Sequence, residues 1–486
     1  MNTTVGLSDL LILSPIIVLF IFSLLPIATK VLNKNKEQNT FATLTTSIVG
    51  LLLAAALLIV FGGSDQTIFN GQLLFDGLTK WTGLIALVSS MAALVLMYDN
   101  PATQKEQFSE IIFLVLNSIC GMLILISAIN LITVFIGLEL MSLSLYLLVA
   151  MSLEQKLSKE AALKYFILGS VASAIFLYGV SFVFGSAGTV NTSELIKNAA
   201  VLIQTNKLFL IGITLIVIGF CFKVSIAPFH AWTPDVYQGA PTPLTLFMAT
   251  AIKTASFAAF LRIASTQFFK GSQSLIDVIQ WLAVITMLLG NIAALMQTSL
   301  KRILAYSSIS HSGYMLVGVL TVGVGANSSY SASTVVFYLL TYSVATIGTF
   351  AILSMLEKSE THFLTIDDLS GLAKNKPMAA FCLTVFLISM AGLPPALGFF
   401  AKLHIFSAAV NEGLVWLALW GVINSVIAIY YYLKPIIYMY MKDGDHDDAT
   451  GNSFGSAILA LVAAFILIVV GIFSGPLFTM IEKSIG

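Results

Sequence analysis

Residues 209–231 read FLIGITLIVIGFCFKVSIAPFHA, an apolar run that contains one charged residue, Lys223, and one proline, Pro228. A run of about 20 apolar residues is long enough to cross a bilayer as a helix. Proline removes a backbone donor and clashes with the preceding turn. At membrane depth such a break is tolerated where the freed groups are buried in protein or line a water-filled cavity. The stretch therefore predicts a membrane span that is interrupted beside a buried lysine.

Similar apolar runs occupy most of the 486-residue chain. The predicted spans are 10–29, 41–61, 80–98, 111–128, 131–150, 162–184, 209–231, 243–262, 276–297, 303–322, 333–355, 378–407, 414–436 and 455–478. Hydrophobic residues make up 58% of the sequence and charged residues 9%, whereas a soluble domain carries about 25% charged residues. Only helices satisfy every backbone amide over so many lipid-facing spans. The sequence thus predicts an all-α polytopic membrane protein with about fourteen transmembrane helices, the seventh and twelfth discontinuous.

The remaining composition argues against several classes of function. The formal net charge is zero, so nothing favours a nucleic-acid partner. The three cysteines, Cys120, Cys221 and Cys382, lie in apolar runs without CxxC spacing, which is typical of core residues and not of metal or iron–sulfur ligands. The acidic run DGDHDD at 443–448 is interpreted as a solvated loop, because no ligand spacing is clear. There is also no glycine-rich phosphate-binding loop. We therefore expect no cofactor and no metal in this chain.

The distribution of basic residues predicts an orientation. If the N-terminus faces outward, 6 of the 23 lysines and arginines fall in outer loops, 3 lie within spans and the other 14 lie in inner loops. Inner loops of membrane proteins are enriched in lysine and arginine. Residues 10–29 lack the basic segment and the cleavage site of a signal peptide, so they are interpreted as a retained first helix. Both termini are predicted to lie on the outer face.

Four charged residues are predicted to lie well inside spans: Glu139, Lys223, Lys253 and Lys402. A charge at the centre of a membrane helix costs about 2.5–3.5 kcal/mol on insertion scales, so such residues usually face the bundle interior and serve function. One lysine alone could simply reach toward the interface or hold two helices together. One acid and three lysines in four separate spans favour a row of proton-carrying groups across the membrane.

The twelfth run resembles the seventh, because SMAGLPPALGFFAKLHIF at 389–406 places Pro394 and Pro395 just before Lys402. The two interrupted spans are five spans apart. A repeat of five helices must be inverted in its second copy, and inverted repeats with broken helices are typical of transporters. The predicted division is a three-helix segment at 1–110, a first repeat at 111–262, a second, inverted repeat at 276–436, and a loop with the last helix at 437–486.

Four further residues are weaker candidates. His311 lies mid-span among serines in AYSSISHSGYM, either on a hydrated path or as a hydrogen-bonded packing residue. His230 and Asp235 flank the break in the seventh span, and a structural role is favoured for both. Lys164 begins the sixth span, where it either biases Glu139 or anchors the inner end of the helix.

Several motifs together resemble one known family. These are FKVSIAPFHAWTPDVYQGAPTP at 222–243, AIKTASFAAFLRI at 251–263, LKRILAYSSISHSGYM at 300–315, DDLSGLAKNKP at 367–377 and AGLPPALGFFAKLHIF at 391–406. They resemble the antiporter-like subunits of respiratory complex I, and the N-type chains in particular. One reason is that Lys402 stands where the similar M-type chains have a glutamate. The resemblance covers roughly residues 130–410.

The resemblance implies a proton-translocating subunit of a bacterial NADH–quinone oxidoreductase in the cytoplasmic membrane. Glu139 and Lys223 would form the coupling ion pair, Lys253 would be the central proton carrier and Lys402 the carrier on the exit side. NADH, flavin, iron–sulfur clusters and quinone would bind to partner subunits. The expected partners are other membrane and peripheral subunits of complex I, including antiporter-like neighbours, together with membrane lipid.

Two alternatives remain open from the sequence. A D-type subunit of an Mrp cation/proton antiporter has the same fold and similar motifs. A membrane enzyme acting on a lipid-linked substrate is disfavoured, because its acids, histidines and arginines would stand in substantial loops. Here the loops are short and the unusual charges lie within spans.

Overall fold

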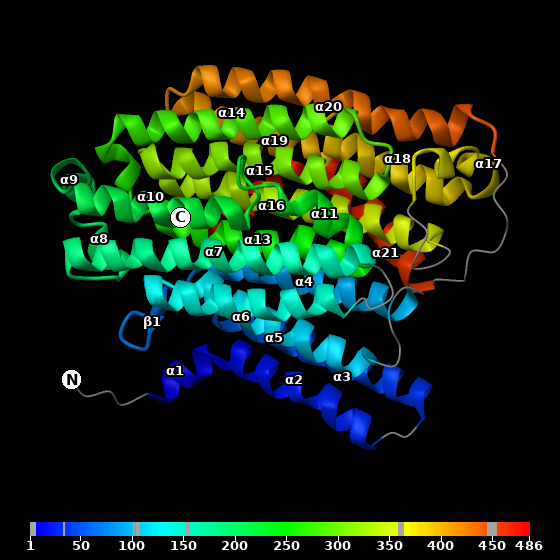
Figure 1. Ribbon diagram of the computed structural model, residues 1–486, viewed down its shortest axis with the longest axis horizontal. Coiled ribbons are helices and arrows are strands. Elements are labelled where there is room, and N and C mark those ends of the chain that lie inside the picture. Colours follow the sequence, from blue (N-terminus) through cyan, green and yellow to red (C-terminus); the bar gives the residue numbers. More distant parts are fainter. Residues whose placement is uncertain are drawn as a thin grey trace.

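The computed structural model describes residues 6–32, 35–100, 103, 107–151, 156–357, 364–444 and 454–486. Long helices lie side by side along one direction and form a bundle (Figure 1). The helices of the first half are α1 (Leu7–Ile12), α2 (Ser14–Leu32), α3 (Lys36–Phe61), α4 (Gly77–Asp99), α5 (Phe108–Ser127), α6 (Leu131–Ala150), α7 (Lys156–Ala187), α8 (Thr192–Leu195), α9 (Ala199–Thr205), α10 (Lys207–Lys223), α11 (Trp232–Gly239), α12 (Thr242–Phe247), η2 (Met248–Ile252) and α13 (Lys253–Ala264).

The helices of the second half continue the bundle. They are η3 (Phe268–Gly271), α14 (Gln273–Leu295), α15 (Leu300–Val324), α16 (Ser328–Leu356), η4 (Asp367–Leu369), α17 (Leu372–Asn375), α18 (Pro377–Ala391), α19 (Leu397–Asn411), α20 (Val415–Met441), α21 (Phe454–Ile472) and α22 (Ser474–Ile485). The described strands, β1 (Gln66–Ile68) and β2 (Leu73–Phe75), form an antiparallel hairpin that was not predicted from the sequence.

The predicted class, an all-α polytopic membrane protein, is confirmed. Twelve helices in the described ranges are long and apolar enough to cross a membrane, and the bent pair α9–α10 would make thirteen. Each of the fourteen predicted spans contains helical residues, but in two of them the helices are too short to cross a membrane by themselves: α10 in one, and α18 and α19 in the other. The count of fourteen therefore stays a prediction, because it requires α10 to be one span and α18 with α19 to be another.

The structure interrupts both spans that were predicted to be discontinuous. α10 ends at Lys223 and the next helix begins at Trp232, so the last part of predicted span 209–231 is not helical. α18 ends at Ala391, and α19 begins at Leu397 after the two prolines. In Figure 1, α10 and α11 follow one another from left to right, whereas α18 and α19 follow one another from right to left. Opposite directions are what an inverted repeat requires; the repeat itself and its boundaries stay predictions.

The two ends of the bundle differ in what they contain. The β1–β2 hairpin, α8 and α9 lie at the left end in Figure 1, and α17 lies at the right end. Helix α1 and the C-terminus also lie toward the left end. The assignment of that side to the outer face of the membrane stays a prediction.

The core of the bundle is formed by three spans that are almost completely covered by protein. In an 18-residue apolar stretch of each helix, buried residues make up 100% of the positions in Thr242–Ala264, 94% in α15 and 89% in α16. In α3, by contrast, the value is 33%. The three central spans carry Lys253 and His311, so the predicted polar residues lie where lipid cannot reach them.

Candidate functional site

Lys223 is the last residue of α10, at the first helix break. Its buried Nζ donates a hydrogen bond to Ser142 Oγ on α6, at 2.6 Å. Ser142 lies one helical turn from Glu139. Among the described residues no ion pair joins Glu139 to Lys223, and Glu139 Oε1 is buried without a hydrogen bond from any of them. The two predicted partners are thus neighbours, with Ser142 holding the lysine.

Lys253 is the first residue of α13, directly after the π-helical turn η2. Its Nζ donates hydrogen bonds to the carbonyl oxygen of Ser308 at 2.7 Å and to its Oγ at 2.5 Å. The ammonium group also lies 5.2 Å from the centre of the Tyr342 ring. A π turn widens a helix by one residue and occurs frequently at functional sites. The sequence did not predict this turn.

His311, on α15, lies in a cluster of tyrosines. Its Nδ1 is 2.6 Å from the Tyr338 hydroxyl, and its Nε2 is 2.9 Å from the Tyr432 hydroxyl, which also contacts Ser307. A neutral imidazole donates from one nitrogen and accepts at the other, and each tyrosine hydroxyl can serve either role. The His311 ring also lies 4.9 Å from the ring of Tyr342 and 5.8 Å from that of Tyr314, and these two rings lie under Lys253 and Lys402, respectively. The histidine therefore lies between two of the predicted carriers.

Lys402, on α19, lies beside the second helix break. Its Nζ donates a hydrogen bond at 2.8 Å to the carbonyl oxygen of Ala391, the last residue of α18, and lies 5.0 Å from the centre of the Tyr314 ring. A cavity of about 10 Å³ adjoins Lys402, His311 and Tyr338, which is about enough for one water molecule. The broken helix thus supplies a free carbonyl that holds the lysine.

Gly392 makes this arrangement possible. It caps α18 in the left-handed conformation, with φ +81°, which favours glycine. A Cβ at this position would lie 2.7 Å from Lys402 Cδ and 3.0 Å from its Nζ. Any larger residue would therefore have to displace the lysine side chain.

The weaker candidates are distributed differently. Lys164 is partly exposed and pairs with Glu160 at 2.7 Å and with Asp235 at 2.9 Å, and Asp235 also pairs with Arg302 at 3.2 Å. No contact joins Lys164 to Glu139 within the described residues, which favours its role as an anchor. His230 is partly buried, and its Nδ1 has no hydrogen bond from the part of the chain that the structure describes.

A buried ion pair at the α17 end of the bundle was missed, because sequence reasoning assigned Lys301 to a loop. Lys301 Nζ lies 2.9 Å from Glu357 Oε1, and both side chains are buried. Glu357 also accepts hydrogen bonds from Asn100 Nδ2 at 2.9 Å and from Thr242 Oγ1. Lys301 donates at 3.3 Å to the carbonyl oxygen of Ala240. The pair joins segments that are far apart in the sequence, so no local pattern indicates it.

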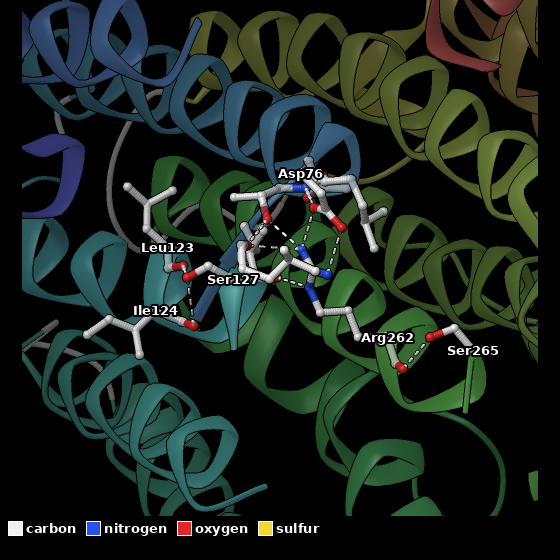
Figure 2. Close-up of polar contacts among 11 residues, drawn as sticks. Asp76, Leu123, Ile124, Ser127, Arg262 and Ser265 are labelled. Carbon is white, nitrogen blue, oxygen red and sulfur yellow. Dashed lines mark hydrogen bonds and ion pairs between the residues drawn. The ribbon is translucent and has the colours of Figure 1, made fainter. Parts of the chain in front are cut away.

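A second missed ion pair joins Arg262 to Asp76, which directly follows the β1–β2 hairpin, and Figure 2 shows it in close-up. Arg262, on α13, donates from Nη2 to Asp76 Oδ1 at 2.6 Å and from Nη1 to Oδ2 at 2.9 Å. It also donates to the carbonyl oxygen of Ile126 at 2.6 Å and to Thr79 Oγ1 at 2.5 Å. Burial alone would raise the pKa of Asp76, but the charge and hydrogen bonds of Arg262 outweigh it and lower this pKa below its ordinary value. A cavity of about 250 Å³ adjoins the pair.

No group of three or more potential metal ligands occurs within the described ranges. Cys120, Cys221 and Cys382 are free and buried, as predicted for core residues. The predicted solvated loop at 443–448 lies outside the described residues from position 445 onward.

Comparisons with known proteins agree with the resemblance. Residues 128–428 match the family model described as NADH:quinone oxidoreductase/Mrp antiporter, TM. The chain is 60% identical over 485 residues to NADH-quinone oxidoreductase subunit N of Bdellovibrio bacteriovorus, covering 100% of both chains. The chain belongs to the NADH:quinone oxidoreductase/Mrp antiporter family.

Several solved structures share the fold of this chain. A chain of respiratory complex I from Thermus thermophilus is 30% identical, with a TM-score of 0.81, over 96% of this chain and 98% of that one. A chain of an archaeal membrane-bound sulfane sulfur reductase is 25% identical, with a TM-score of 0.84, over 98% and 96%. A chain of the Mrp complex from Dietzia is 19% identical with a TM-score of 0.80, over 99% and 97%, which shows the fold alone. These relatives belong to multi-subunit membrane complexes, so partner subunits are expected here as well.

Proposed function

We propose that this chain moves protons across the membrane through Glu139, Lys223, Lys253, His311 and Lys402, as a subunit of NADH–quinone oxidoreductase. The observation that carries the proposal is the position of His311, which is held by two tyrosine hydroxyls and packs against the two tyrosine rings that lie under Lys253 and Lys402. The family membership and the 60% identity to a subunit N support the same assignment.

The contacts of the three lysines suit proton carriers. Each buried ammonium group is held by hydroxyl or carbonyl oxygens, and no carboxylate of a described residue lies at ion-pair distance from it. A buried ammonium without a counter-charge loses its proton more readily than one in water, and a nearby carboxylate restores the charged form. A small movement of Glu139 relative to Lys223 would therefore release or retain a proton. The helices are already interrupted beside Lys223 and Lys402, so the chain can move there without bending an intact helix.

The remaining roles follow from this assignment. NADH, flavin, iron–sulfur clusters and quinone would bind to other subunits, with quinone reduction there driving proton movement here. The chain would lie in the bacterial cytoplasmic membrane with both termini on the outer face. The Mrp alternative is less supported, since the Dietzia chain is 19% identical and shares the fold alone.

The test compares Lys253→Ala with Lys197→Ala, which changes an exposed lysine. The whole complex is purified in mild detergent and reconstituted into vesicles, and protons translocated per NADH oxidised are measured with subunit content checked in the same preparation. We expect Lys253→Ala to assemble, because removing an isolated buried charge relieves its desolvation cost, and to translocate fewer protons. Translocation equal to that of Lys197→Ala would refute the proposal.

A further inference from the structure

The helix α20 is weakened at the two tyrosines that it brings to the central histidine. Pro435 lies inside this helix. A proline inside a helix cannot donate to the carbonyl oxygen four residues before it, which here belongs to Tyr431, and its ring crowds that carbonyl group. Tyr432 follows directly, and its hydroxyl lies 2.9 Å from His311 Nε2. The helix backbone therefore fixes the two tyrosines less firmly than a regular turn would.

The packing around the two tyrosines also leaves free space. A cavity of about 20 Å³ adjoins Tyr431, Tyr432 and Pro435. Most of its other lining residues are leucines and isoleucines, so it offers the tyrosine hydroxyls few polar partners. A void deprives the side chains that line it of the contacts that would otherwise hold them. Packing on this side therefore does not by itself fix the positions of the two rings.

A polar contact from α14 holds the first of these tyrosines. The Tyr431 hydroxyl donates a hydrogen bond to Oδ1 of Asn291, a fully buried residue, at 3.0 Å. Asn291 Nδ2 donates to the carbonyl oxygen of Asn424, at 3.0 Å, and to its Oδ1, at 3.1 Å. A backbone carbonyl oxygen can only accept, so the amide nitrogen must face Asn424 and the amide oxygen must face the tyrosine. The amide of Asn291 therefore has one orientation, in which Tyr431 is the donor.

The helix that carries Asn291 is itself fixed against α15, which carries the histidine. A Cβ at Gly290 would lie 2.7 Å from the backbone nitrogen of Ser310 on α15, and a Cβ at Gly313 would lie 3.0 Å from that of Met287 on α14. Small residues at such positions let the backbones of two membrane helices touch. The two helices thus form a fixed frame, and Asn291 holds α20 on this frame.

We propose that Asn291 is a positioning residue that keeps Tyr432 in contact with His311, acting through Tyr431. The inference rests on the proposed function. The rings of Tyr431 and Tyr432 lie 4.5 Å apart, so a displacement of the first also displaces the second. The amide of Asn291 neither gains nor loses a proton. By accepting the single proton of the Tyr431 hydroxyl, it commits that group to a structural bond, whereas the Tyr432 hydroxyl contacts the histidine directly.

The test removes this contact from each of its two sides in the intact complex. Asn291→Leu replaces the amide by an apolar side chain of similar size. Tyr431→Phe removes one oxygen and leaves the ring, so it gives the answer if Asn291→Leu does not assemble. Asn291→Asp is the conservative variant, because a neutral carboxylic acid can accept from Tyr431 and donate to the Asn424 carbonyl oxygen. Asn117→Leu is the matched control, since within the described ranges its amide bonds only the carbonyl oxygen of Phe113 in its own helix, at 2.8 Å.

Protons translocated per NADH oxidised are measured in vesicles over a range of pH, with the subunit content checked in the same preparation. Lys253→Ala is the reference for a lost carrier. We expect Asn291→Leu and Tyr431→Phe each to lower translocation severalfold, the double variant to lower it no further, and Asn117→Leu to match the unaltered complex. Asn291→Asp should approach the unaltered complex as the pH is lowered, because only its neutral form restores both contacts.

Two results would overturn the inference while the proposed function stands. One is normal translocation by Asn291→Leu and Tyr431→Phe when Lys253→Ala is impaired, which would show that the amide serves packing alone. The other is a double variant that is much more impaired than either single variant, which would show that the two residues act separately. If Lys253→Ala translocates normally, the proposed function fails, and this inference fails with it.

Discussion

Replacing Gly392 by alanine should impair proton translocation without removing any titratable group. Gly392 has φ +81°, and a left-handed conformation costs an L-residue about 1–2 kcal/mol. The new Cβ would also lie 2.7 Å from Lys402 Cδ, well inside the normal contact distance of about 3.5–4.0 Å between carbon atoms. The lysine would have to move, and its 2.8 Å hydrogen bond to the Ala391 carbonyl oxygen would be lost or lengthened.

Gly413 provides the matched control for this variant. It also has a left-handed φ, +77°, but nothing lies within 4 Å of a Cβ built there. Gly413→Ala should therefore lower the thermal stability of the purified complex by the backbone cost of about 1–2 kcal/mol alone. Gly392→Ala should show that cost and, in addition, a severalfold fall in protons translocated per NADH oxidised in vesicles. Equal translocation by the two variants would refute the argument that Gly392 holds Lys402 in a working position.

Three further changes test the polar contacts. Glu357→Gln should destabilise the complex by about 3–5 kcal/mol, because it leaves Lys301 charged and unpaired. Adding Lys301→Met should recover most of this loss, as measured by thermal inactivation in detergent. No recovery in the double variant would show that the ion pair is unimportant. The pKa of Asp76 is lowered in the folded protein. Its ionised form therefore stabilises the fold above the unfolded-state pKa of about 3.9, and this contribution is lost as the pH falls through the folded-state pKa. Arg262→Met should abolish this acid sensitivity in melting curves recorded at falling pH. Tyr338→Phe removes the hydroxyl that contacts His311 Nδ1, and it should slow proton translocation in vesicles while the subunit content is unchanged. A normal translocation rate would show that this hydroxyl serves packing alone.

Much of the fold was available from the sequence, because membrane insertion is governed by local properties. The hydropathy of each run and the length that a bilayer requires predicted where the spans lie. The prolines beside Lys223 and Lys402 predicted the two interruptions that the structure shows. The scarcity of charge made the four charged residues inside the spans stand out individually. Each of these inferences needed only neighbouring residues in the chain.

The partners of those charges were decided by tertiary structure. The family resemblance implied a pair of Glu139 with Lys223, and the structure shows the lysine hydrogen-bonded to Ser142, a residue 81 positions away. Arg262, at the end of a predicted span, pairs with Asp76 across 186 positions. The π turn before Lys253 and the tyrosines around His311 were likewise not predicted. A buried polar group must find a partner in three dimensions, and which residue supplies it depends on how distant helices pack together, which the order of residues along the chain does not reveal.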